Sequence, residues 1–113
     1  MKLMTKEIAS KLEAAAAKGT EGMSPIPVVV KFFDPCGSWT WYAVEGEKVG
    51  PGENDWLCFG LVEGFESELG FFSVAELAEV KGPLGIGIER DLHFSGMAID
   101  TESFPAKVVE GGA

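Results

Sequence analysis

The sequence has few of the residues on which metal sites and redox sites usually depend. It contains a single histidine, His93, and two cysteines, Cys36 and Cys58. The cysteines show no Cys-x-x-Cys spacing and have no histidine nearby, so the usual pattern of a zinc or redox site is missing. Two isolated cysteines are typical of a reducing compartment, and whether they pair stays open. We therefore expect no metal and no cofactor.

Basic residues and long apolar runs are also scarce. The chain has 9 lysines and arginines against 18 acids, a formal net charge of −9 at pH 7. Half of the acids lie between Glu45 and Glu79, where Lys48 is the only basic residue. This balance disfavours nucleic acid as a partner, because phosphate binding needs basic side chains. No stretch reaches the ~20 apolar residues of a membrane span, and the charged N-terminal segment is unlike a signal peptide. We expect a cytoplasmic protein with no membrane contact.

Apolar residues are plentiful by comparison and predict a folded α+β domain. They make up 46% of the 113 residues, which is enough for a core. We expect one domain over residues 1–102 and a loose tail over residues 103–113. Thr5 and Gly19 are typical ends of a helix, and the "SVAE" that begins at Ser73 is a capping box. The expected order is a helix at 5–18, antiparallel strands near 28–33, 39–45, 55–64 and 68–72, a short helix at about 74–80, and a last strand at 86–94.

The stretch "KFFDPCGSWTWYAVEGE", residues 31–47, concentrates aromatic residues around a turn. Because strand residues two apart share a face, Trp39 and Trp41 point one way with Ala43, while Tyr42 points the other way with Val44. The neighbouring strands are also apolar on both faces. The second face must then be covered by one of the helices, by the C-terminal segment folding back, or by a partner. We expect the tryptophan face to build the core and the Tyr42 face to be the more available one.

Candidates for catalysis are weak. In "ERDLHF", His93 would share a strand face with Glu89 and Asp91, but side chains spaced two apart along one strand splay too far to close a tight site. The glycine-rich "GPLGIG" lacks the lysine and hydroxyl residue of a phosphate-binding loop. No serine lies in a nucleophile-elbow motif. We expect no catalytic residues and hence no enzyme.

Three segments carry a family resemblance. "WTWYA", "FGLVEGFESELGFFSVAEL" and "GPLGIGIERDLHF", with the N-terminal "LMTKEIASKL", resemble the bacterial family known as domain of unknown function 2958 over roughly residues 2–94. The resemblance implies a small protein carried on plasmids, phages and other mobile elements. It implies no activity and no catalytic residues.

These observations lead to one main hypothesis and two alternatives. The main hypothesis is a non-enzymatic accessory protein of a mobile genetic element that binds another protein. The alternatives are an acidic decoy of a DNA-binding defence protein and a single-stranded nucleic acid binder that uses the N-terminal lysines and the aromatic residues; a homodimer also stays open. The partner surface we expect combines aromatic and acidic side chains: Trp39, Trp41, Tyr42, Trp56, Glu45, Glu47 and Asp55.

Overall fold

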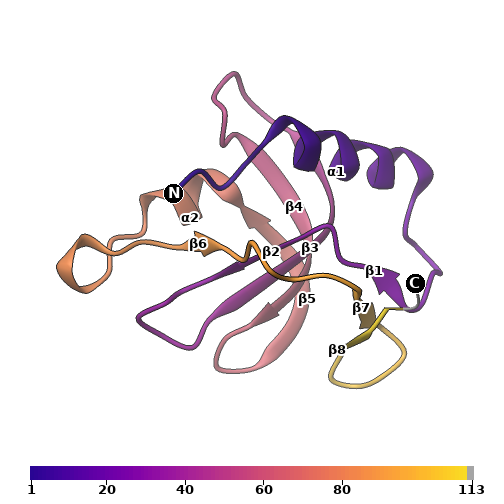
Figure 1. Cartoon of the computed structure of the whole chain (residues 1–113). Helices are drawn as coiled ribbons and strands as arrows, with labels where there is room; N and C mark the ends of the chain where they lie inside the picture. Colours follow the sequence, from indigo (N-terminus) through magenta and orange to yellow (C-terminus); the bar gives the residue numbers. More distant parts are fainter. Residues whose placement is uncertain (112–113) are drawn as a thin grey trace.

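The computed structural model describes residues 1–111 and has the expected α+β architecture, with one long helix and two antiparallel sheets (Figure 1). No helix among these residues is long and apolar enough to cross a membrane. The elements in chain order are α1 (Lys6–Lys18), β1 (Ile26–Pro27), β2 (Val30–Phe33), β3 (Thr40–Lys48), β4 (Trp56–Glu63), β5 (Ser67–Ser73), α2 (Val74–Glu79), the short 3-10 helix η1 (Pro83–Gly85), β6 (Glu89–Arg90), β7 (Met97–Asp100) and β8 (Lys107–Glu110).

The main sheet has five strands in the order β5-β4-β3-β2-β6, and every neighbouring pair is antiparallel. Strands β2 to β5 correspond to the four strands predicted from the sequence, with ends that differ by at most three residues. The last predicted strand, residues 86–94, was too long, since only Glu89–Arg90 pair with β2. Residues 86–88 and 91–94 lie outside any strand, and Ile86 closes a tight loop in which its carbonyl accepts a hydrogen bond from the Gly82 amide.

Both helices begin where the sequence predicts. The Thr5 side chain accepts a hydrogen bond from the Ile8 amide at 3.1 Å, and Gly19 ends α1 with φ +84°, a conformation that glycine adopts readily. Ser73 accepts from the Glu76 amide at 3.2 Å and so caps α2. These caps satisfy backbone groups that would otherwise lack a partner.

The first core lies between one face of the main sheet and the two helices. Leu12 from α1 and Leu77 from α2 both pack onto this face, so the helices share one side of the sheet. Trp41 and Ala43 point into this core as predicted, whereas Trp39, expected on the same face, is not among its residues. The fully buried Phe32 lies near the centre of the core and meets Phe72 edge to face, with ring centroids 6.4 Å apart.

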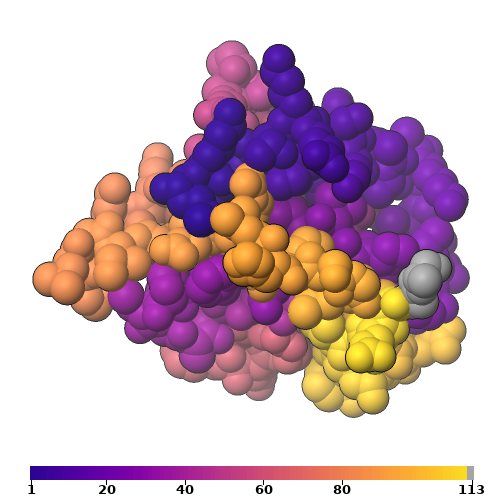
Figure 2. Space-filling view, in the orientation of Figure 1, coloured from indigo at the N-terminus to yellow at the C-terminus, as the bar shows by residue number. Residues whose placement is uncertain are grey.

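A second core lies on the opposite face, under a small sheet with the order β1-β7-β8. Tyr42 and Val44 pack there against Ile99 and Ala106. The C-terminal segment thus folds back over the face, which was one of the three coverings expected. Residues 107–110, expected in a loose tail, instead form β8 and pair with β7, and Figure 2 shows this yellow segment packed against the rest of the molecule. Residues 112–113 lie outside the described residues.

Candidate functional site

The seven residues expected to form one surface are separated by the fold. Tyr42 is 7% exposed and Trp56 is 4% exposed, so the prediction that these two belong to an accessible surface was wrong. Tyr42 is covered by the small sheet, which the sequence did not reveal. Trp56 packs into the first core.

Trp39 and Trp41 lie together at one end of the main sheet. Their ring centroids are 6.0 Å apart, and Phe65 meets Trp39 edge to face at 5.5 Å. The Trp39 ring lies directly over Gly64, where an added Cβ would come within 2.5 Å of it. Asp55 lies elsewhere, in the loop before β4, where its carboxylate accepts from the Gly52 amide at 2.7 Å. These residues stabilise a hairpin end and a loop.

An irregularity in β3 turns the two acidic residues away from the tryptophans. The pairing of β3 with β4 shifts between Ala43 and Glu45, which leaves Val44 as an extra residue in β3. Such a bulge reverses the alternation of faces beyond it. Glu45 and Glu47 therefore stand opposite Phe59 and Leu57, on the face that carries the second core.

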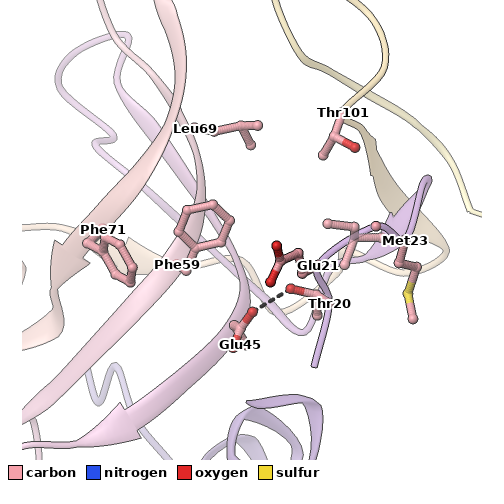
Figure 3. Close-up of a pocket in the computed structure, with 10 residues that line it drawn as sticks. Thr20, Glu21, Met23, Glu45, Phe59, Leu69, Phe71 and Thr101 are labelled. Carbon is pink, nitrogen blue, oxygen red and sulfur yellow. Dashed lines mark hydrogen bonds between the residues drawn. The ribbon is translucent and has the colours of Figure 1, made fainter. Parts of the chain in front are cut away.

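The small sheet leaves part of this second face open, and the open part is a groove. A cavity of about 360 Å³ has Phe59, Leu69 and Phe71 on one side and residues 20–23 with Thr101 on the other (Figure 3). Phe71 is 70% exposed, and its ring lies 5.1 Å from that of Phe59. The floor of the cavity is thus aromatic and open to solvent.

Two neighbouring cavities extend this space at both ends. One of about 170 Å³ shares Phe59 and Phe71 with it, and one of about 700 Å³ shares Leu69 and Thr101. We call the three connected cavities the β4–β5 groove. Among the described residues, its lining includes no lysine and no arginine, and it includes five glutamates: Glu21, Glu45, Glu47, Glu66 and Glu68. An apolar floor with an acidic rim attracts positively charged groups that also carry apolar surface.

One hydrogen bond fixes a wall of the groove. The buried Thr20 hydroxyl donates to the Glu45 carboxylate, as the dashed line in Figure 3 marks. This contact joins the segment after α1 to the bulge in β3. It holds the Glu45 carboxylate in this wall, beside the aromatic floor.

Two titratable groups outside the groove are buried in the cores, and burial shifts their pKa values. Burial raises the pKa of the Cys58 thiol to about 12, so this sulfur stays protonated and unreactive at neutral pH. Cys36 is exposed, and both cysteines are free thiols. Burial, with the nearby Glu63 carboxylate, raises the pKa of Tyr42 to about 12.

His93 does not form the proton-transfer pair considered from the sequence. Its side chain belongs to an exposed turn, and its backbone amide donates to the Asp91 carboxylate at 2.8 Å. This hydrogen bond, with Lys31 at 3.4 Å, lowers the pKa of Asp91. Within residues 1–111, no group of three or more histidine, cysteine, aspartate or glutamate side chains is placed to hold a metal ion.

The groove residues carry only a weak signal in the sequence. In "SELGFFS", residues 67–73, the alternation places Leu69 and Phe71 on one face of a strand. Large apolar side chains are usually buried, so this alternation alone does not mark the two as exposed. Only the position of the small sheet shows that they remain exposed.

The fold and the groove define a small α+β domain whose main sheet carries helices on one face and a partial second layer on the other. The chain belongs to the family described as "Protein of unknown function (DUF2958)", whose model matches residues 3–102. No significant match appears among curated proteins or among solved structures.

Proposed function

We propose that this protein is a non-enzymatic interaction module that binds a basic, partly apolar segment of another protein in the β4–β5 groove. The observation that carries the proposal is the exposure of Phe71 (70%) and Leu69 (39%) beside Phe59 on the groove floor. Contiguous exposed apolar side chains with a polar rim are typical of interaction sites. Burying a phenylalanine of this kind contributes roughly 1.5–3 kcal/mol to binding.

The charges around the groove support a basic partner. The groove carries five glutamates, and the chain as a whole has a net charge of −9. The negative electrostatic potential of these acidic side chains increases the association rate of a positively charged segment and disfavours acidic partners. It also opposes close approach of a second copy of this chain through the same groove.

The proposed setting is the cytoplasm of a bacterium that carries a mobile genetic element, where the protein serves as an accessory protein. This part of the proposal comes from the sequence segments that resemble the family. The aromatic groove fits it, because an accessory role needs a contact surface and no catalytic group.

The test uses the tagged chain on a solid support and a bacterial host lysate, with and without nuclease treatment. A captured protein is identified by mass spectrometry, purified, and titrated against the wild-type chain, Phe71→Ser and Phe65→Ser. Phe65 is the matched control, since it is 95% exposed, meets Trp39, and lines none of the three cavities. We expect Phe71→Ser to weaken binding at least about tenfold, because burial of one phenylalanine is lost. Phe65→Ser should stay within about threefold of the wild type.

The other outcomes would overturn the proposal in favour of a named alternative. Equal binding by Phe71→Ser and the wild type means that the groove is not the site. If the affinity of this groove-independent binding also decreases strongly as the salt concentration rises, the acidic decoy becomes the better hypothesis, since exposed charges are screened by salt. If capture disappears with nuclease, the protein binds nucleic acid.

A further inference from the structure

Strand β5 is an open edge of the main sheet, and its length sets it apart from the other edges. It is the outermost strand in the order β5-β4-β3-β2-β6 and has 7 residues. The other outer strands, β1, β6 and β8, have 2, 2 and 4 residues. Natural sheets usually protect a long edge with proline, lysine or a covering segment. β5 contains no proline or lysine, and Glu68 is its one charged residue.

The largest cavity of the β4–β5 groove opens onto this edge. It is lined by four consecutive residues, 66–69, and by residues 103–106 of the loop between β7 and β8. Residues 67–69 belong to β5, and successive side chains of a strand point to opposite faces, so a cavity lined by all three also faces the backbone of the edge. In Figure 1, the hairpin between β4 and β5 and the loop between β7 and β8 lie on the same side of the molecule. Phe104, fully exposed, stands in the opposite wall.

We infer that the partner segment binds as an added β-strand, hydrogen-bonded to β5, between this edge and the loop that carries Phe104. The inference depends on the proposed function, and it specifies how the groove is occupied. An extended segment at such an edge obtains affinity from backbone hydrogen bonds and specificity from alternate side chains. The cavity volume, about 700 Å³, is in the range of established ligand sites.

The two faces of β5 define the chemistry of the added strand. Leu69 and Phe71 lie over the groove floor. Glu68 pairs with Val62 on the first-core side of the sheet, and it lines the largest cavity along the edge of the strand. Side chains directly opposite each other on paired strands approach to roughly 5 Å and interact. The complementary segment therefore alternates apolar residues, which contact Leu69 and Phe71, with basic residues, which contact Glu68.

The test measures binding of a blocked heptapeptide of alternating valine and arginine to the full chain by fluorescence polarisation. Two further peptides carry backbone N-methyl groups, one on every valine and one on every arginine. In an added strand only one of these two sets of amides faces β5. We expect one N-methylated peptide to lose at least about tenfold in affinity and the other to stay within about threefold, since each hydrogen bond contributes on the order of 1 kcal/mol.

Charge variants test the contact that basic residues of the added strand make with Glu68. Glu68→Lys should weaken binding of the alternating peptide several-fold more than Glu13→Lys, which makes the same net charge change on the exposed face of α1. Both side chains are exposed, so both variants should fold. A peptide of the same composition with its valines and arginines in two blocks should bind more weakly than the alternating one.

The results separate this inference from the proposed function. If both N-methylated peptides bind equally while Phe71→Ser still loses the captured protein, strand addition is wrong and the groove proposal stands. If the alternating peptide does not bind at all, strand addition by a basic segment is wrong. If the chain sediments as a dimer that Phe71→Ser dissociates, the occupant of the edge is a second copy.

Discussion

At the scale of single residues, Val44 decides which face the acidic side chains take. Simple alternation along the strand would place Glu45 with Trp41, and the bulge at Val44 places it with Phe59 instead. The bulge also keeps Val44 itself buried in the second core. One unpaired residue therefore brings acidic side chains to an aromatic floor.

Tyr42 is the only tyrosine, so a pH titration of phenolate absorbance reports on it alone. Burial and Glu63 raise its pKa from 10.0 to about 12 in the folded protein. The neutral phenol therefore stabilises the fold fully below pH 10, and this contribution is lost as the pH rises toward 12. We expect ionisation near pH 12 in the native state, with the free energy of unfolding decreasing over this interval.

The control for this titration is Tyr42→Phe, which should lose less stability over the same pH interval. A residual decrease is expected because the pKa of Cys58 is also raised to about 12. Ionisation of Tyr42 at pH 10 in the folded protein would show that its hydroxyl is hydrated, contrary to the buried position described above.

At the scale of elements, the cap of α2 gives a quantitative prediction. The Ser73 hydroxyl accepts a hydrogen bond from the Glu76 amide at 3.2 Å. Replacing a capping serine with alanine typically lowers the free energy of unfolding by about 1 kcal/mol. Ser73→Ala should lower the free energy of unfolding in urea by about this amount. Ser67→Ala, at the other end of β5, precedes no helix and is the matched control. An equal loss in both variants would mean that the effect belongs to the strand.

The sequence predicted the elements whose signals are local. Thr5, Gly19 and Ser73 identified the helix ends, and alternation in β3 placed Trp41 and Tyr42 on opposite faces. These features depend on neighbouring residues, which a single sequence displays directly.

The small sheet was not predicted because its strands are short and lack a local signal. β1 has 2 residues, and β7 and β8 have 4 each, too few for a clear alternation. They are stabilised by packing onto Tyr42 and Val44 from distant parts of the chain. The candidate site was missed for the same reason, since the exposure of Phe71 depends on where this sheet stops.

At the scale of the whole molecule, the second core depends on residues that the family match does not include. The match ends at residue 102, whereas Ala106 and Val108 pack into this core. Removal of residues 103–113 should lower the free energy of unfolding by at least about 2 kcal/mol, because this apolar burial is lost. It should also increase binding of a hydrophobic dye, as the Tyr42 face becomes exposed.

Val108→Ser in the full chain is the milder comparison, and it should shift the urea midpoint in the same direction by a smaller amount. An unchanged midpoint after the truncation would mean that β8 contributes nothing to the second core and that residues 103–113 are dispensable for folding.

The two cores also become complete at different times during translation. The first needs residues up to Ile88, and the second needs residues up to Val108. A growing chain therefore passes through a stage in which the main sheet has its helices in place while the Tyr42 face is bare. At that stage both this face and the edge of β5 are accessible, and the nascent protein is a better target for chaperones than the finished one.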